Sequence, residues 1–482
     1  MKKYKSLILL LSVAIIMVCS GKLKSQPNTL YFMKGIPQTK DLNPARPGIE
    51  SGFYISMPLF SKLDLSYNTN NWSYSDLIHW GTGPRKDSLV LDMNKFMSSL
   101  GKTNFVMESA ALTFLEAGFK SGKNFFAASV SEKEFAEFFF HKNLVKLINY
   151  GNYPYLGTTF NSGTFGIGAQ HYLEFAFNYS RDVSKKLTIG AAAKLLFGMA
   201  AVQTNGLTFK ASSPLSGESL DVIASGRANI SAPVDFKYNN AGDITSVANN
   251  FDGKNYFNNF GNPGFAVDMG FAYHVNKKFE FSMSIIDLGV ISWHTNTTRL
   301  TEKGHLLYNG VQIADPLSPT LPAIQPLINN LGDSIQKAFR PDNSARGFST
   351  LLPVKIYIGG DYKLNETVSL SGLARVRIYN NLVHTSLTAS TNVLVWNGIS
   401  LSGSYSIMES TYDNLGVGVG FRGGPFQIYA ATDNLFSPFY PSRATNMNLR
   451  VGINLIFGDR EREKKSGREK GRGINSDCHC PN

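Results

Sequence analysis

Charged side chains stand at alternate positions inside runs that are otherwise apolar, and Asp268 is the clearest case. It lies between the apolar residues Val267 and Met269, within the run Gly264 to His274. Successive side chains of a β-strand point to opposite faces, so we expect Asp268 on the face away from the apolar residues. A strand with one apolar face and one charged face is typical of the wall of a membrane barrel.

The same interpretation of the other predicted strands places nine charged side chains on the polar face. Most acidic ones fall on the earlier strands and most basic ones on the later strands, with Lys194 as an exception. The candidates are Glu108, Glu116, Glu174, Lys194, Asp268, Lys355, Arg375, Arg377 and Arg450. An acidic side of the lumen would then face a basic one. Two interpretations stay open: a structural network, because an isolated buried charge is costly, or the lining of a wet path that selects what passes.

Catalytic motifs do not occur in this chain. It has no Gly-x-Ser-x-Gly phrase, no His-Glu-x-x-His phrase and no phosphate-binding loop. His171 is expected on the outward face, and His274, His294 and His384 have no evident partners for a triad. Cys478-His479-Cys480 offers three ligands, fewer than a structural zinc site needs. We therefore predict no enzyme, no cofactor and no metal site.

The elements that position these charges are alternating runs joined by short turns. Residues 264–274 and 279–288 flank the turn Asn276-Lys277-Lys278, and each run has about the 9 to 11 residues that a membrane-crossing strand needs. Five more tight turns are predicted. They lie at residues 120–123, 184–186, 365–366, 397–398 and 423–424.

The connections between these hairpins are mostly long and polar. The long ones cover residues 69–102, 140–163, 210–262, 298–345 and 436–446. If Ser219 to Phe236 is loop structure and not wall, the count is about fourteen strands, an even number as in single-chain barrels. We predict an all-β fold, a transmembrane antiparallel β-barrel with long extracellular loops and short periplasmic turns. Glu132 to Tyr150 fits either a short helix or a strand followed by a loop.

The two ends of the chain differ from the barrel. Residues 1–25 are predicted to form a signal peptide, with lysines followed by an apolar core. Gly21 and Ser25 are the two alternative cleavage positions, and Cys19 gives a less favoured lipoprotein alternative. The full chain has a formal net charge of +12. Removal of residues 1–25 leaves 42 basic and 35 acidic residues. This surplus does not indicate a nucleic-acid binder. Residues 26–50 form an N-terminal segment, 51–458 the barrel, and 459–482 a charged, disordered periplasmic tail.

Several phrases carry a family resemblance. Residues 28–33 (NTLYFM), 42–45 (LNPA), 261–270 (GNPGFAVDMG), 286–289 (IDLG) and 432–435 (TDNL) resemble phrases of a bacteroidete-type family of outer-membrane barrels of unknown function. The Asn-Pro-Ala phrase is also similar to one in the wider superfamily of FadL-like transporters and PorV-like secretion-associated barrels. The resemblance implies an outer-membrane barrel of about fourteen strands whose N-terminal segment enters the lumen.

Function is expected to follow from the lumen or the loops. The first hypothesis is FadL-like binding or transport of a small hydrophobic molecule, with Asn43, Pro44 and Ala45 as a plug or hatch. The alternative is a cell-surface structural or secretion-associated barrel whose loops, residues 210–262 and 298–345, contact a protein partner. Expected partners are outer-membrane lipid and the outer-membrane assembly machinery, because the last strand alternates and ends on Phe457.

Overall fold

The protein is described by a computed structural model that covers most of the chain. The described residues are 28–58, 61–217, 219–239, 244–257, 259–302, 305–308, 339–341, 347–380, 382–395, 398–408 and 411–458. The predicted signal peptide and the predicted tail, with Cys478, His479 and Cys480, lie outside these residues.

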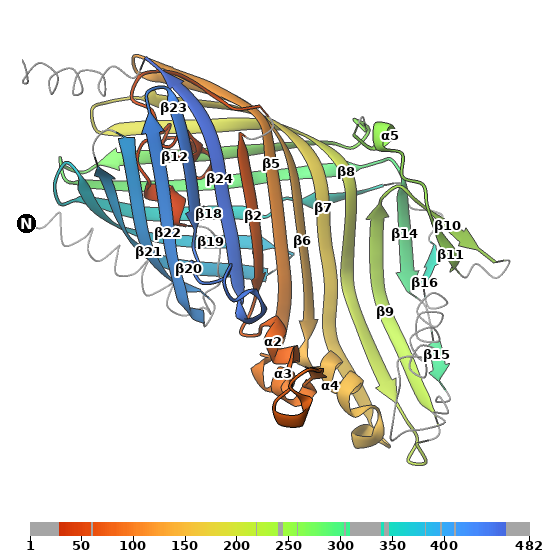
Figure 1. The fold of residues 1–482 in the computed structure, drawn as a ribbon. Coiled ribbons are helices and arrows are strands. Elements are labelled where there is room, and N and C mark those ends of the chain that lie inside the picture. The colour runs from red at the N-terminus through yellow and green to blue at the C-terminus, as the bar shows by residue number, and fades with distance from the viewer. Residues whose placement is uncertain are drawn as a thin grey trace, which may run out of the picture.

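Alternating side chains produce long strands that pair with their neighbours along the chain to form a closed, fourteen-stranded antiparallel barrel (Figure 1). The wall consists of β1 (Gly52–Ser56) continued by β2 (Lys62–Thr69), β5 (Thr103–Ser121), β6 (Asn124–His141), β7 (Thr159–Asp182), β8 (Leu187–Ser212), β12 (Pro263–His274), β13 (Phe279–Trp293), β17 (Phe348–Leu351) continued by β18 (Val354–Lys363), β19 (Val368–Tyr379), β20 (Leu382–Val395), β21 (Ile399–Met408), β22 (Thr411–Gly423), β23 (Phe426–Thr432) and β24 (Asn446–Phe457). The first and last strands close the ring, with Phe53 opposite Phe457 and Leu65 opposite Leu449. The predicted fold class is therefore confirmed.

The hairpin of β12 and β13 has the predicted turn. Phe271 lies opposite Met283, and the side chain of Asn276 accepts the backbone N–H groups of Lys278 and Phe279. Such turns lie at one end of the barrel, which we call the turn end. The opposite end is the loop end.

The loop end carries the helices and a strand extension (Figure 1). Its elements are α2 (Tyr74–Leu77), β3 (Ile78–Trp80), η3 (Gly83–Arg85), β4 (Leu89–Leu91), α3 (Met93–Ser99), α4 (Lys142–Tyr150), η4 (Tyr153–Tyr155), β9 (Leu220–Ser231), β10 (Val234–Tyr238), β11 (Ile244–Asn249), α5 (Gly253–Phe257), β14 (Thr297–Glu302), β15 (His305–Tyr308), β16 (Phe339–Pro341) and η6 (Pro441–Arg443). The two alternatives for residues 132–150 are each correct for one part, because β6 runs to His141 and α4 follows it.

β9 is a regular strand, but it does not help to close the barrel. β12 pairs with Leu187–Phe197 of β8, and β9 pairs with the later residues Ala201–Ser212. The other edge of β9 pairs with β14 and β15. Omitting residues 219–236 from the wall was therefore correct, whereas expecting only loop structure there was not.

Apolar side chains cover the outside of the barrel. On β12 and β13, Phe265, Met269 and Leu288 are 44–49% exposed, whereas the inward Ser282 and Ser284 are buried. This arrangement is the inverse of a water-soluble barrel and fits a wall that faces lipid. Among the helices in the described part of the chain, none is long and apolar enough to span a bilayer.

Candidate functional site: a charged cavity beside the N-terminal segment

The N-terminal segment, residues 28–50, lies inside the barrel (Figure 1). It contains two short 3-10 helices, η1 (Thr29–Phe32) and η2 (Pro37–Asp41). Its side chains bond to strands around the ring: Asn28 Nδ2 donates to Ser386 on β20 (2.9 Å), and Gln38 Nε2 donates to Asn454 on β24 (2.8 Å). Asn43 of the same segment bonds to Phe271 on β12, across the ring from β24, so the segment occupies the lumen.

The three predicted plug residues all lie in this segment, against β8, β12 and β13. Asn43 is fully buried; its Nδ2 donates to the Tyr31 hydroxyl (3.0 Å) and to the Phe271 carbonyl (3.2 Å), and its Oδ1 accepts the Ala45 N–H. Pro44 lies so close to Gly190 of β8 that a Cβ at this glycine would collide with the Pro44 backbone. The small residue therefore sets how closely the segment approaches the wall.

The start of the segment is fixed by a buried carboxylate. Asp433 accepts the backbone N–H groups of Asn28 and Thr29, both at 2.8 Å, and also bonds to the Thr29 hydroxyl. A carboxylate that accepts backbone N–H groups forms charge-assisted hydrogen bonds, which are stronger than neutral ones. Asp433 therefore anchors the segment at its first described residues.

One face of the segment packs against apolar residues of the wall. Leu30, Phe32, Met33, Ile36 and Leu42 are buried, and Tyr31 stacks on Tyr357 with ring centroids 5.4 Å apart. The wall residues that complete this cluster are Ile286, Tyr357, Leu373, Tyr429 and Ala431. We call this the apolar face of the segment.

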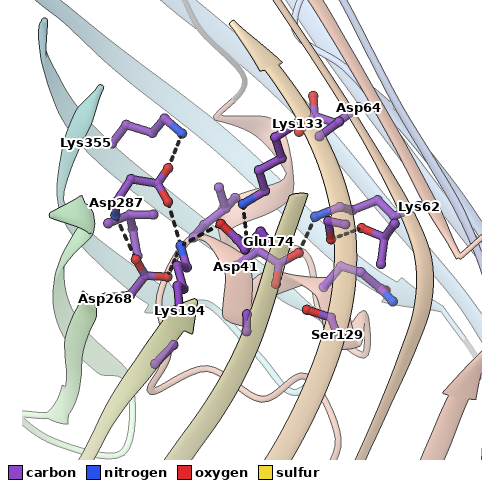
Figure 2. Close-up of a pocket in the computed structure, with 18 of the residues that line it drawn as sticks. Asp41, Lys62, Asp64, Ser129, Lys133, Glu174, Lys194, Asp268, Asp287 and Lys355 are labelled. Carbon is purple, nitrogen blue, oxygen red and sulfur yellow. Dashed lines mark hydrogen bonds and ion pairs between the residues drawn. The ribbon is translucent and has the colours of Figure 1, made fainter. Parts of the chain in front are cut away.

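The opposite face of the segment borders a cavity of about 130 Å³. Leu30, Gln38, Lys40, Asp41 and Leu42 line it on the segment side. The wall side is contributed by β2, β5 to β8, β12, β13, β18, β19 and β24, mostly with polar and charged side chains (Figure 2). We call this the charged face.

Lys194 is the centre of the largest ion network in the described residues (Figure 2). Its Nζ lies 2.6 Å from both Asp268 and Asp287, and Lys355 Nζ lies 2.6 Å from the other oxygen of Asp287. The backbone N–H of Asp287 donates to Asp268 (2.7 Å). Burial of several charges is tolerated here because each has an opposite charge within contact.

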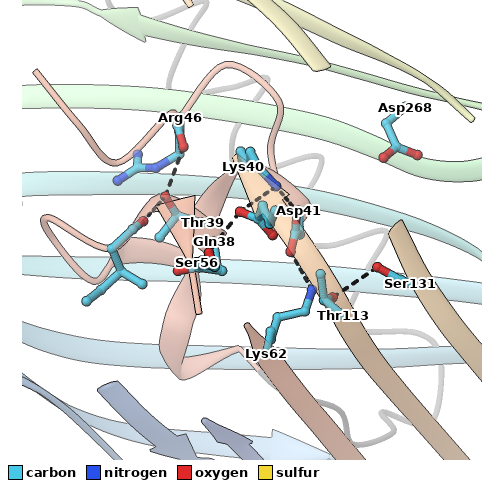
Figure 3. Close-up of polar contacts among 12 residues, drawn as sticks. Gln38, Thr39, Lys40, Asp41, Arg46, Ser56, Lys62, Thr113, Ser131 and Asp268 are labelled. Atoms are coloured by element: carbon cyan, nitrogen blue, oxygen red, sulfur yellow. Dashed lines mark hydrogen bonds and ion pairs between the residues drawn. The ribbon is translucent and has the colours of Figure 1, made fainter. Parts of the chain in front are cut away.

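A second network joins the segment to the wall (Figure 3). Lys40 Nζ lies 2.6 Å from Asp41 and 3.1 Å from Glu116, and Lys62 pairs with the other Asp41 oxygen. Burial opposes both charges, yet the pKa of Lys40 lies above its usual value because Asp41 and Glu116 are adjacent. Lys40 and Lys62 likewise hold the pKa of Asp41 below its usual value despite burial. Both groups are therefore charged at neutral pH.

The structure brings eight of the nine predicted lumen residues to this cavity. They are Glu116, Glu174, Lys194, Asp268, Lys355, Arg375, Arg377 and Arg450. The expected separation into an acidic and a basic side is wrong, because neighbouring strands supply opposite charges: Lys133 on β6 lies 2.6 Å from Glu174 on β7. Pairing between adjacent strands neutralises each side locally.

Glu108 is the exception, since its side chain is exposed while the preceding Met107 is buried. The pairing of β5 with β6 shifts register between Thr113 and Leu115. Such a β-bulge adds one residue and exchanges the two faces of the strand beyond it. A regular alternation counted back from Glu116 therefore assigns Glu108 to the wrong face.

Two residues around Lys194 and Glu174, Lys133 and Asp287, were missed by the sequence interpretation for different reasons. Lys133 follows the regular alternation from Phe135 and could have been found. Asp287 adopts a left-handed backbone (φ 63°) beside the register shift between Val267 and Met269. Aspartate tolerates this conformation better than most residues, but no periodicity signals it.

The fold and its lipid-facing exterior define a transmembrane β-barrel with a filled lumen. A family model described as "Family of unknown function (DUF5723)" matches residues 45–433, and the chain belongs to that family. No curated protein matches the chain.

Three solved structures have a similar fold. A Pseudomonas aeruginosa FadL homologue is 11% identical, with a TM-score of 0.39, and the match covers 91% of this chain and 100% of that one. The Pseudomonas putida toluene transporter TodX is 10% identical, with a TM-score of 0.36 and coverage of 90% and 97%. A deltaS2S3 mutant of the TodX monoaromatic hydrocarbon channel is 11% identical, with a TM-score of 0.39 and coverage of 91% and 100%. Likenesses this distant carry no argument about a ligand.

Proposed function

We propose that this protein is a non-enzymatic outer-membrane barrel that binds or transports a small hydrophobic molecule, with the N-terminal segment as a hatch. The observation that supports this proposal is the apolar face of the segment. Barrel interiors are usually polar, yet Ile286, Tyr357 and Leu373 point into this lumen and are covered by the segment.

Movement of the segment would uncover a concave apolar surface on the wall. Leu373 is 3% exposed and Ile286 is 3% exposed while the segment is in place. Binding pockets for small apolar molecules are mostly lined by such side chains, with a few polar groups. The uncovered surface would therefore favour a hydrophobic ligand over water.

A reversible cross-link tests the hatch. Asn43 lies against Gly270 of β12, where an added Cβ would be 3.0 Å from the Asn43 side-chain carbon. We would introduce Asn43→Cys and Gly270→Cys with Cys478→Ser and Cys480→Ser, and measure binding of the hydrophobic probe N-phenyl-1-naphthylamine in proteoliposomes. Oxidation should abolish saturable binding and reduction should restore it. Each single cysteine variant is the control, and equal binding by the oxidised and reduced forms would contradict the hatch.

A second candidate function is a cell-surface accessory role through protein contacts. The observation in its favour is that β8 extends beyond β12 and carries the sheet of β9, β14 and β15 outside the closed ring. A pure channel does not require this structure. Native mass spectrometry of protein extracted in mild detergent separates the candidates: a retained lipid-sized ligand supports the first, and a stoichiometric protein partner supports the second.

A further inference from the structure

Most cations on the charged face have a carboxylate partner, and Arg377 does not. Lys133, Lys194, Lys355 and Arg450 each lie within 2.8 Å of an Asp or Glu oxygen. Among the described residues, no carboxylate lies within ion-pair distance of Arg377, although this side chain is only 2% exposed. A buried guanidinium without a counter-ion is strongly unfavourable. We therefore expect a negatively charged group to bind beside it.

The surroundings of Arg377 hold its guanidinium in place without satisfying its donors. The group lies over the Phe135 ring, 4.3 Å from the centroid, and its Nη1 contacts the Met107 sulfur. Nε and Nη2 are fully buried and meet no acceptor among the described residues, so an oxyanion reaches them only when the neighbouring side chains shift. These two nitrogens form one edge of the planar guanidinium, and such an edge binds both oxygens of a carboxylate or phosphate in parallel.

Glu137 is the nearby acid that acts on Arg377, but it is engaged elsewhere. Its Oε1 lies 2.8 Å from His384 Nε2, and His384 is the cross-strand partner of Arg377. Glu137 is completely buried, and its Oε2 has no hydrogen-bond partner among the described residues. It lowers the local positive potential without filling the donor edge of Arg377.

A second guanidinium lies two residues along the same strand. Arg375 also lines the cavity, and its guanidinium lies 5.3 Å from the Tyr357 ring centroid. Alternate residues of β19 face the same side, so both positive charges act on the same space. The cavity of about 130 Å³ is several times larger than the roughly 10–15 Å³ that one water molecule needs.

We propose that the charged face of the lumen binds a small hydrophilic oxyanion, a carboxylate or a phosphate, on the Nε and Nη2 edge of Arg377. The anion supplies the counter-charge that the described residues do not provide at this position. Arg377 is not a member of the apolar cluster on which the proposed hydrophobic ligand depends, although Leu30, Leu42, Ile286 and Tyr357 border both that cluster and the cavity. Either proposal can therefore fail without the other.

Isothermal titration calorimetry on the purified full chain in detergent tests the site, with inorganic phosphate in one arm and succinate in the other at matched ionic strength. The wild type should bind at least one of them. Arg377→Gln should weaken that binding by about tenfold or more, because a bidentate charged contact is lost. Arg450→Gln is the matched control, since Arg450 already pairs with Asp64 at 2.8 Å; it should change the affinity by less than about threefold.

Two further variants keep the proposal testable if Arg377→Gln does not fold. Arg377→Lys keeps the charge but loses the planar fork, so it should bind more weakly than the wild type. Glu137→Gln removes a competing negative charge and should strengthen binding. Absence of binding by the wild type to either anion, or wild-type affinity in both Arg377 variants, would overturn the proposal. Phosphate binding without succinate binding, or the reverse, identifies which oxyanion the site takes.

Discussion

The two faces of the N-terminal segment contact the barrel wall through different kinds of interaction. The apolar face buries Leu30, Phe32 and Ile36 against wall residues, so its contacts are non-directional and numerous. The charged face relies on a few contacts between ions that are buried with their partners. Apolar packing tolerates exchange for another apolar side chain of similar volume, whereas removal of one ion leaves its partner buried and unpaired. The charged face should therefore be the more fragile one.

Lys194→Met should produce the largest effect. It leaves Asp268 and Asp287 with fewer counter-charges in a buried site, and breaking such a network costs about 3–5 kcal/mol. Urea unfolding in detergent micelles, followed by tryptophan fluorescence, measures the change. Lys185→Met in the exposed turn is the control. A loss below about 1 kcal/mol would mean that water, and not Lys194, screens these carboxylates.

Gly190→Val tests how closely the segment approaches the wall. The new side chain collides with the Pro44 backbone, and overpacking of this kind costs about 1–3 kcal/mol. Because the segment can yield more easily than the wall, residues 28–50 should become accessible to a protease added from the turn end. Gly403→Val on β21 is matched, since nothing lies within 4 Å of its Cβ position. Equal protection of the segment in both variants would contradict the close contact.

Asp433→Asn should have a smaller effect at the other end of the segment. Asparagine keeps one acceptor oxygen but loses the charge that strengthens the bonds from Asn28 and Thr29, a loss of about 1–2 kcal/mol. Hydrogen exchange of the first described residues should rise while the barrel amides stay protected. The exposed Asp87→Asn variant controls for removal of a negative charge. Unchanged exchange at residues 28–33 would show that packing alone holds the segment.

Regular alternation explains what could be predicted from the sequence. It is a property of single strands, so the hairpin at Asn276, the strand count and the inward position of Glu116 followed from it. Features that depend on two strands at once did not follow. The bulges beside Thr113 and Val267 arise from register between neighbours, and the pairing of Lys133 with Glu174 depends on which strands are adjacent.

The comparison of Glu108 with Glu116 is the sharpest test of that argument, and the Glu108 substitution has the smallest expected effect. Both stand on β5 and appeared equivalent by alternation, but Glu116 is 1% exposed and accepts the Tyr54 hydroxyl (2.8 Å), whereas Glu108 is exposed. Glu116→Gln should destabilise the barrel by about 1–3 kcal/mol, because the buried Lys40 loses part of its counter-charge. Glu108→Gln should change the unfolding free energy by less than about 0.5 kcal/mol.

The same urea unfolding experiment measures both variants. Equal losses would place Glu108 in the lumen and remove the bulge from β5. A loss for Glu116 alone would mean that one extra residue near Thr113 decides which carboxylates reach the charged face. The lumen of this barrel would then be specified by the positions of its bulges as much as by its alternating pattern.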